Sequence, residues 1–328
     1  MMKSKNKLNN AFSLIELSIV ILIIGILVTG ITQSSRLVRQ MKISTAQSLT
    51  RSSPVPNRNL MFWWETSLEE SFLSGEASEG NEITQWNDNN PLTTMKIHGY
   101  RGQKTTVNTF NYDFSGFSSA RGPSYVADGI NSLPSLRFFN SGSAVYMQTD
   151  SKFKNSGNEN LLMFLVIRYR SGTGWIVDRV CQNPNGSGNS IGCASSRYLG
   201  LPLFGLVLSG LTLEGIVRDN VNAATINSNA NAGTFISSQT PFIVAVERKY
   251  RQTVSTYLNG KLSTSVTDNQ GIANIDMVKL GRHEINTSDN LDFDISEFIY
   301  YVGSIANEDR DAIEDYLGKK YNIKIAHQ

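Results

Sequence analysis

The sequence predicts a mainly β protein that begins with one long transmembrane helix and ends with a short helix. The first observation is an apolar run over residues 11–31 that holds a single charged residue, and as a helix this run spans about 30 Å of hydrocarbon. The second is a series of short apolar runs after residue 60, separated by turns rich in Gly, Asn and Ser, which is typical of a β-sandwich or barrel. The third is a capped amphipathic segment over residues 307–320, which predicts a helix after the last strand.

The composition is that of a folded protein without charge bias. Of 328 residues, 40% are hydrophobic and 18% are charged, which excludes a disordered or collagen-like chain. The 30 Lys and Arg are scattered and nearly balanced by 28 Asp and Glu, so no nucleic acid partner is expected. The chain has two cysteines and three histidines, His98, His283 and His327. They are too few and too far apart in the sequence to predict a structural zinc site or a Cys/His catalytic centre.

The N-terminal helix is predicted to continue beyond the membrane. Lysines at positions 3, 5 and 7 precede the apolar run and favour a cytoplasmic N-terminus with the rest of the chain outside. No small-residue cleavage site follows the run. Because helical spacing persists to Leu49 and no proline occurs before Pro54, we expect one helix from Phe12 to about Leu49, roughly 57 Å long.

Residues 11–17, Ala-Phe-Ser-Leu-Ile-Glu-Leu, and the apolar run that follows resemble the prepilin signature of type IV pilins and type II secretion pseudopilins. The resemblance implies that a prepilin peptidase cuts between Ala11 and Phe12 and methylates the new amine of Phe12. The family usually has Gly before the cut, where this chain has Ala11. It further implies that other pilin or pseudopilin subunits are partners, and that Glu16 pairs with the Phe12 amine of a neighbouring subunit.

Glu16 also stands out on physical grounds. A carboxylate within an apolar helix costs about 2.5–3.5 kcal/mol on insertion scales and is retained where it finds a partner. The alternative is a Glu that is solvated near the membrane surface. Many major pilins carry a kinking proline in the mature helix, whereas residues 29–33 contain none, which favours a pseudopilin or minor pilin.

Two prolines and the lack of an apolar face mark residues 51–59 as a linker. The expected organisation is a leader peptide over 1–11, a pilin-like transmembrane and assembly helix over 12–50, the linker over 51–59 and a β domain over 60–328. The expected location is the bacterial inner membrane, crossed once, with the β domain in the periplasm or on the cell surface in a pilus-like filament.

Nine apolar runs are expected to be strands of the β domain. They are Ser135–Phe139, Ala144–Gln148, Leu161–Tyr169, Gly174–Val177, Phe204–Leu208, Phe242–Glu247, Thr253–Leu258, Met277–Leu280 and Asp294–Val302. Asn259 and Gly260 predict a hairpin turn with positive φ at both positions. In the final helix, Asn307 is the expected N-cap and Gly318 marks the expected end.

Several motifs of the β domain resemble concanavalin A-like, laminin-G-like jelly rolls of secreted bacterial proteins. They are Phe62–Ser67, Gln85–Asp88, Leu133–Phe138, Tyr257–Lys261 and Asp294–Tyr301, followed by the final helix. The resemblance covers most of residues 60–325 and implies a jelly-roll sandwich. Family members are commonly carbohydrate-binding or adhesive modules, and some relatives are glycanases.

The pattern Asp292-x-Asp294-x-x-Glu297 approaches the E-x-D-x-x-E spacing of jelly-roll glycanases, whose paired carboxylates act as nucleophile and acid/base. Its first position is Asp rather than Glu, which is shorter by one methylene where the geometry is demanding. Non-catalytic laminin-G-like domains carry similar strands. We therefore expect no enzymatic activity, with catalysis by these carboxylates as the alternative.

The four tryptophans are candidates for a sugar-binding surface. Trp63, Trp64, Trp86 and Trp175 could stack on sugar rings, or they could fill the core of the sandwich. Core filling is the more common role of such side chains.

A calcium site and a disulfide are the remaining candidates. Asp289, Asp292 and Asp294 could supply oxygen ligands to calcium, or they could form a solvated strand end; no other cofactor is expected. Cys181 and Cys193 enclose a segment rich in Asn, Gly and Ser. They are expected to pair in an oxidising compartment, for on the order of 3 kcal/mol, and to be reduced in the cytosol.

The sequence therefore predicts a pilin-like subunit, either a minor pilin or a pseudopilin of a type IV pilus or type II secretion system. Its β domain is expected to bind a glycan or a protein surface. The alternatives are a membrane-anchored carbohydrate-binding adhesin and, less favoured, a tethered glycan hydrolase.

Overall fold

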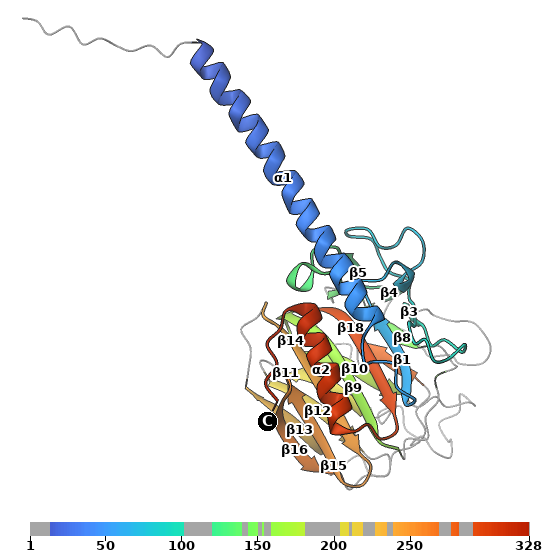
Figure 1. The fold of residues 1–328 in the computed structure, drawn as a ribbon. Helices are drawn as coiled ribbons and strands as arrows, with labels where there is room; N and C mark the ends of the chain where they lie inside the picture. Colours follow the sequence, from blue (N-terminus) through green and yellow to red (C-terminus); the bar gives the residue numbers. More distant parts are fainter. Residues whose placement is uncertain are drawn as a thin grey trace, which may run out of the picture. The chain divides into compact units, whose positions relative to one another are not determined.

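The chain divides into two compact units, Met1–Ser44 and Thr45–Gln328 (Figure 1). All described strands belong to the second unit, which we call the β domain. The structure, a computed structural model, describes residues 14–101, 120–139, 144–149, 153, 159–180, 204–209, 212–218, 227–234, 239–268, 277–281 and 291–327.

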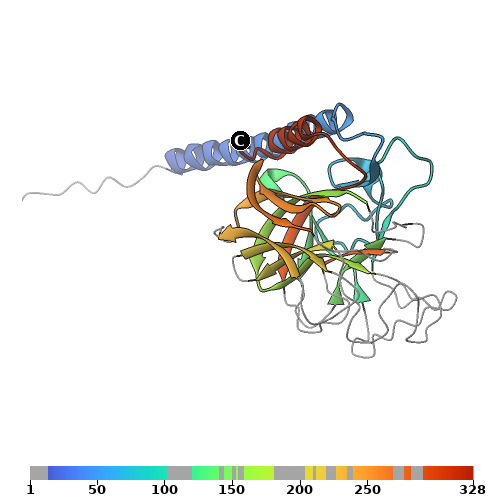
Figure 2. The ribbon, with the colours of Figure 1, turned by 90° about the horizontal axis from the view of Figure 1, so that it is seen from below.

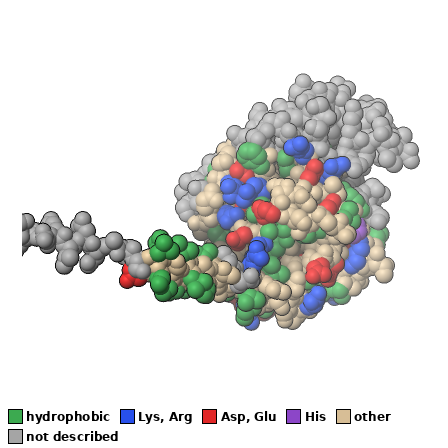
Figure 3. All heavy atoms as spheres, turned by 90° about the horizontal axis from the view of Figure 1, so that it is seen from above, with side chains coloured by type: hydrophobic (Ala, Val, Ile, Leu, Met, Phe, Trp, Pro, Cys, Tyr) green, Lys and Arg blue, Asp and Glu red, His purple; other side chains and the backbone are tan. Residues whose placement is uncertain are grey.

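Helix α1 spans Leu14–Arg51, and its residues up to Ser44 form the described part of the first unit. It is long and apolar enough to cross a membrane, with a mean hydropathy of 2.7 over its most apolar window. Figure 3 shows hydrophobic side chains gathered on this helical segment. The Ser18 and Thr29 hydroxyls each donate to the carbonyl oxygen four residues earlier at 2.8 Å. These two side chains therefore bring no unsatisfied donor into an apolar surrounding.

One antiparallel sheet of the β domain, sheet A, contains the central strand β18. Strands β6 and β1 follow one another along one edge of β18, because β6 pairs with residues 292–295 and β1 with residues 297–301. Strand β9 pairs along its other edge. The order is β16-β15-β14-β9-β18-β6-β5 with β1 beside β18, where β1 is Leu60–Glu65, β5 Ser124–Val126, β6 Ser135–Phe139, β9 Leu161–Ser171, β14 Pro241–Lys249, β15 Thr253–Leu258, β16 Lys261–Thr267 and β18 Asp292–Val302.

The second antiparallel sheet, sheet B, faces sheet A. Its order is β13-β12-β11-β10-β17-β8-β3-β2, where β2 is Gln85–Trp86, β3 Gly99–Arg101, β8 Met147–Thr149, β10 Gly174–Val180, β11 Phe204–Ser209, β12 Thr212–Arg218, β13 Asn227–Thr234 and β17 Met277–Leu280. Strands β4 (Ala120–Arg121) and β7 (Ala144–Val145) form a separate parallel pair. Two short 3-10 helices, Glu69–Ser71 and Ile130–Ser132, lie in the connections.

The core lies between the two sheets and is rich in stacked aromatic rings. Phe62 stacks on Tyr300 with ring centroids 5.2 Å apart, and Phe138 stacks on Phe293 at 4.9 Å. Strand β9 is buried on both faces, because alternate residues enter this core while the opposite face of sheet A lies under helix α2 (Asn307–Tyr321), as Figure 2 shows. This double burial explains why β9 is a continuous apolar run rather than an alternating one.

The predicted mainly β fold, with a long N-terminal helix and a short C-terminal helix, is confirmed. Each of the nine predicted runs falls on strands, although the second is divided between β7 and β8 at Tyr146. The predicted hairpin joins β15 to β16, with φ of 49° at Asn259 and 84° at Gly260. None of the nine predicted runs covers β12 or β13.

The ends of α2 differ from the prediction. The N-cap is Ala306 rather than Asn307, and Gly318 lies inside the helix rather than at its end. A Cβ on Gly318 would come within 2.4 Å of Ile325 Cγ1, so this glycine is needed for close packing of the following segment. Asn322, in the left-handed conformation with φ of 51°, ends the helix instead.

Residues 52–59 contain no helix or strand. Within them Val55 is fully buried, and the Tyr301 hydroxyl donates to the Val55 carbonyl oxygen at 2.7 Å. The segment predicted as a linker is therefore anchored to sheet A at this point.

Candidate functional site

The first candidate site is the N-terminal end of α1. Glu16 lies in the first turn of the helix and is exposed. A carboxylate there interacts favourably with the positive end of the helix dipole. Ala11 and Phe12, the predicted cleavage and methylation residues, lie outside the described residues.

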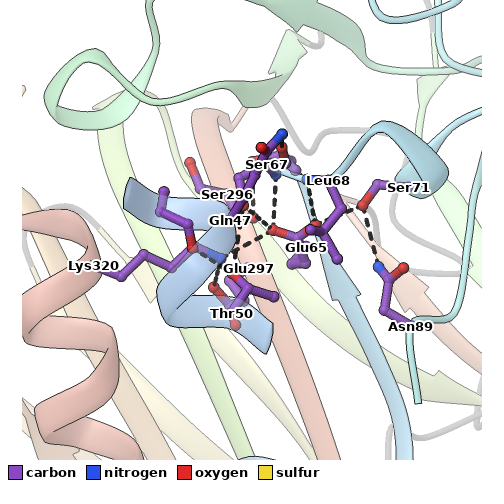
Figure 4. Close-up of polar contacts among 12 residues, drawn as sticks. Gln47, Thr50, Glu65, Ser67, Leu68, Ser71, Asn89, Ser296, Glu297 and Lys320 are labelled. Carbon is purple, nitrogen blue, oxygen red and sulfur yellow. Dashed lines mark hydrogen bonds and ion pairs between the residues drawn. The ribbon is translucent and has the colours of Figure 1, made fainter. Parts of the chain in front are cut away.

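The second candidate site is a buried polar cluster in the β domain, drawn in Figure 4. We call it the joint cluster, because its side chains come from the end of α1, from β1 and the residues after it, from β18 and from α2. Its members are Thr50, Glu65, Ser67, Glu297, Tyr316 and Lys320.

Lys320 is the only cation of the joint cluster and lies between its two carboxylates. The Nζ atom lies 2.9 Å from Glu65 Oε2 and 2.8 Å from Glu297 Oε2, and it donates to the Tyr316 hydroxyl at 3.2 Å. The side chains of Lys320, Glu65 and Glu297 are 0% exposed. Burial of such charges is tolerated where they are paired and hydrogen-bonded.

Glu65 is held mainly by the chain that follows it. Its Oε2 accepts from Ser67 N at 2.8 Å and Ser67 Oγ at 2.6 Å, and its Oε1 accepts from Leu68 N and Ser71 Oγ, both at 2.7 Å. Burial raises the pKa of Glu65, but Lys320 and the two serine hydroxyls outweigh burial and hold this pKa below 4.5.

Glu297 is surrounded by side-chain donors. Its Oε1 accepts from Trp63 Nε1 at 2.7 Å and from the Tyr316 hydroxyl at 3.0 Å, and its Oε2 accepts from Lys320 and from the Tyr321 hydroxyl at 2.9 Å. Burial raises the pKa of Glu297 despite the nearby Lys320. With four donors and no exposed surface, this carboxylate is arranged as a structural acceptor.

The joint cluster fixes the last turns of α1 to the β domain. Thr50 Oγ1 lies 3.3 Å from the Tyr316 hydroxyl and 3.5 Å from Ser67 Oγ, and Gln47 Nε2 donates to the Ser67 carbonyl oxygen at 2.9 Å. Thr50 is 2% exposed. The last turns of α1 are thus bonded to Ser67, which follows β1, and to Tyr316 of α2.

The predicted Asp292–Asp294–Glu297 pattern does not form one carboxylate pair. Asp294 is fully buried, and its Oδ1 accepts from Arg137 Nε at 2.8 Å while its Oδ2 accepts from Arg168 Nε at 2.9 Å. Asp292 is buried with Arg170 Nε 3.4 Å from its Oδ2. The expected solvated strand end is therefore wrong for Asp292 and Asp294, which are buried and paired with arginines. Asp289 lies outside the described residues.

All four tryptophans are buried, which fits the more common role in the protein interior rather than a sugar-binding surface. Trp64 and Trp86 are 0% exposed and lie in the core, with their indole N–H groups donating to the carbonyl oxygens of Ile97 at 2.8 Å and Glu65 at 2.7 Å. Trp63 is 3% exposed and Trp175 is 8% exposed. Cys181 and Cys193 lie outside the described residues, so their pairing stays a prediction.

Glu65 and Lys320 had not been predicted as site residues from the sequence. One signal for them was present: Lys320 follows Tyr316 by four residues and so extends the apolar stripe of the helix. A lysine on a stripe that faces a sheet requires a buried partner, and the acidic end of the apolar strand Leu60–Glu65 offers one.

Residues 6–32 match the family model for the prokaryotic N-terminal methylation motif. The chain carries a prepilin-like N-terminal segment joined to a β domain. The match overlaps the apolar part of α1 and includes Ala11, Phe12 and Glu16. No curated protein sequence matches the chain.

Solved structures similar to the chain include clostridial toxin domains. A structure of botulinum neurotoxin type C, described as interacting with two ganglioside molecules, is 14% identical, covers 80% of this chain and gives a TM-score of 0.49. The botulinum neurotoxin serotype D binding domain is 14% identical, covers 83% and gives 0.48. The binding domain of paraclostridial mosquitocidal protein 1 is 13% identical, covers 79% and gives 0.49. The matched regions are 52%, 53% and 52% of those chains, so this chain spans about half their length.

Proposed function

We propose that this protein is a pilin-like subunit, a minor pilin or pseudopilin, that is anchored in the bacterial inner membrane by α1 and presents its β domain on the outer side. The observation that carries the proposal is the methylation motif over residues 6–32, which overlaps a helix able to cross a membrane. Exposed apolar side chains along such a helix need lipid or other helices around them. The membrane supplies the lipid, and a filament of pilin-like subunits then supplies the other helices.

The joint cluster supports the proposal that α1 anchors the β domain and displays it. The chain joins α1 to the β domain covalently. Hydrogen bonds from Thr50 and Gln47 to Ser67 and Tyr316 also hold the last turns of α1 on that domain. We propose that the β domain acts by binding. Its ligand is a glycan or a protein surface. Asp294 and Glu297, two carboxylates of the glycanase-like pattern, are proposed to serve structure, because they accept bonds from arginine, lysine, tryptophan and tyrosine donors.

Maturation is the first test of the proposal. Intact mass and N-terminal sequencing of the protein from membranes, with and without prepilin peptidase, should give a mature chain that begins at methylated Phe12 only when the peptidase is present. A chain that begins at Met1 or Met2 under both conditions would contradict the pilin pathway. It would leave a membrane-anchored adhesin as the better description.

Assembly is the second test. Glu16→Leu should abolish incorporation into filaments, because the proposed partner of Glu16 is the Phe12 amine of a neighbouring subunit. Its control is Glu69→Leu, which changes an exposed glutamate of the β domain. Tryptophan fluorescence should be unchanged in Glu16→Leu, since the tryptophans report the β domain. Normal incorporation of Glu16→Leu would remove the assembly role of this residue.

A further inference from the structure

The end of the chain folds back beside α2, as Figure 1 shows. Ala326 N donates to the Asn259 carbonyl oxygen at 2.9 Å, so the segment after the helix is bonded to the tip of the β15–β16 hairpin. A Cβ on Gly260 would come within 2.5 Å of Ile325 Cγ2 and 3.1 Å of His327 Nδ1. The glycine required by the turn therefore also makes room for His327.

His327 lies against three acidic side chains of α2. Its Nδ1 lies 3.6 Å from Glu314 Oε2 and 3.8 Å from Asp311 Oδ1. Its Nε2 lies 2.8 Å from Asp315 Oδ1, a hydrogen-bond distance. Since an ionised carboxylate only accepts, the hydrogen-bond network assigns the proton to Nε2 in the neutral ring. In that tautomer Nδ1, the ring nitrogen nearest Glu314 and Asp311 by these distances, carries no proton.

Glu314 gives the second, independent observation. Its side chain is 0% exposed, and among the described residues no donor forms a hydrogen bond to either of its carboxylate oxygens. The nearest guanidinium atom, Arg310 Nε, is 4.0 Å from Oε2. Arg310 instead donates through Nη2 to Asp311 Oδ1 at 2.8 Å and stacks over Tyr257 with its Cζ 4.1 Å from the ring centroid. A buried carboxylate in this position requires a cation or a donor.

We propose that Asp311, Glu314 and His327 bind a divalent transition-metal ion such as Zn²⁺, and that Asp315 orients the imidazole. The three ligand atoms lie within 4.8 Å of one another. Tetrahedral Zn²⁺ places its nitrogen and oxygen ligands about 3.3 Å apart, so the separations of 3.6 and 3.8 Å at Nδ1 need to shorten by only a few tenths of an ångström. A histidine that bonds to a carboxylate through its other ring nitrogen is the usual arrangement at such ions.

The ligand set and the local charge select this class of ion. Calcium takes six to eight oxygens and does not favour imidazole, whereas Zn²⁺ and its neighbours accept mixed nitrogen and oxygen ligands. Asp311, Glu314 and Asp315 carry three negative charges when ionised and Arg310 carries one positive charge. A divalent ion would neutralise the remainder. It would also fasten the end of the chain to α2.

The test uses the full-length protein without a histidine tag, in detergent. Titration with Zn²⁺ by calorimetry should give one site per chain, and Co²⁺ substitution should give the visible absorption of a four-coordinate site. Asp315→Asn should weaken Zn²⁺ binding about 10- to 100-fold. His327→Ala and Glu314→Gln, which remove ligands, should weaken it further. Glu308→Gln, an exposed acid in the first turn of α2, is the control and should bind like the wild type.

His327 is exposed, so His327→Ala is expected to fold even if a change at the buried Glu314 does not. Zn²⁺ should raise the Tm of the wild type and leave that of His327→Ala unchanged, because a ligand stabilises only the state that binds it. Wild-type protein that fails to bind Zn²⁺ at millimolar concentration would overturn the proposal. Equal binding by the wild type and His327→Ala would overturn it too. The outcome does not depend on whether the chain assembles as a pilin.

Discussion

Replacing Lys320 by Met should destabilise the β domain by about 3–5 kcal/mol, the range found when one partner of a buried ion pair is removed. Lys320 Nζ lies 2.9 Å from Glu65 and 2.8 Å from Glu297, and all three side chains are 0% exposed. Met retains most of the apolar stem, so the loss of packing is small. The main cost is that two carboxylates lose their only cation within the cluster.

Part of this cost is avoided if the Glu297 carboxylate takes up a proton. Burial raises the pKa of Glu297 even while Lys320 is present, so removing Lys320 should raise this pKa further and favour the protonated carboxyl. A protonated Glu297 no longer carries an unpaired buried charge, which limits the loss of stability.

Urea unfolding followed by tryptophan fluorescence measures this loss, because the buried Trp63, Trp64 and Trp86 report the β domain rather than the membrane helix. The Tm should fall by about 6–10 °C, at roughly 2 °C per kcal/mol for a domain of this size. Lys319→Met on the same helix is the control: Lys319 is exposed, so its change should stay within about 0.5 kcal/mol. A loss below about 1 kcal/mol for Lys320→Met would refute the reasoning.

Three further outcomes are expected in the same unfolding assay. Gly318→Ala should destabilise the domain by about 1–3 kcal/mol, although alanine favours helices, because its Cβ would meet Ile325 Cγ1 at 2.4 Å; a gain in stability would show that the following segment is not packed there. Asp294→Ala should cost about 3–5 kcal/mol, since it leaves Arg137 and Arg168 side by side without their carboxylate, and a neutral result would mean that water replaces it. The pKa of Glu65 is lowered by Lys320 and its serine donors despite burial, so its ionised form stabilises the fold above pH 4.5 and this contribution is lost as the pH falls further. The difference in unfolding free energy between the wild type and Glu65→Gln should therefore be smaller at pH 3.5 than at pH 7, and an equal difference would show that Glu65 does not titrate with unfolding.

Local chemistry in the sequence predicted those parts of the fold that depend on neighbouring residues. The Asn259-Gly260 turn follows from the positive φ that both residues tolerate. The runs Thr253–Leu258 and Met277–Leu280 were predicted with the observed bounds because each is apolar or β-branched between turn residues. Strand β13, Asn227–Thr234, has neither feature. It lies at the edge of sheet B, where it pairs with β12.

Features that depend on residues distant in the sequence were predicted less well. The end of α2 was misplaced because the approach of Ile325 requires Gly318 within the helix. Asp294 and Glu297 were recognised as unusual, but their partners Arg137 and Lys320 come from other elements. Lys320 and Glu65 are separated by 255 residues, so no local pattern joins them. The tryptophans show the same limit, because the residue type alone is compatible with a sugar-binding surface as well as with a buried core.

The position of β18 has a consequence for folding. This strand lies inside sheet A, between β9 on one edge and β6 with β1 on the other, yet it is the last described strand in the chain. Leu60 pairs with Tyr301, so β1 cannot pair with β18 until nearly the whole sequence of the domain is present. Contacts of such long sequence separation slow folding and leave strand edges exposed meanwhile. If the chain is exported while unfolded, sheet A closes only after β18 has crossed the membrane. Until then β1 lacks its partner, and the edge of β9 that pairs with β18 stays open.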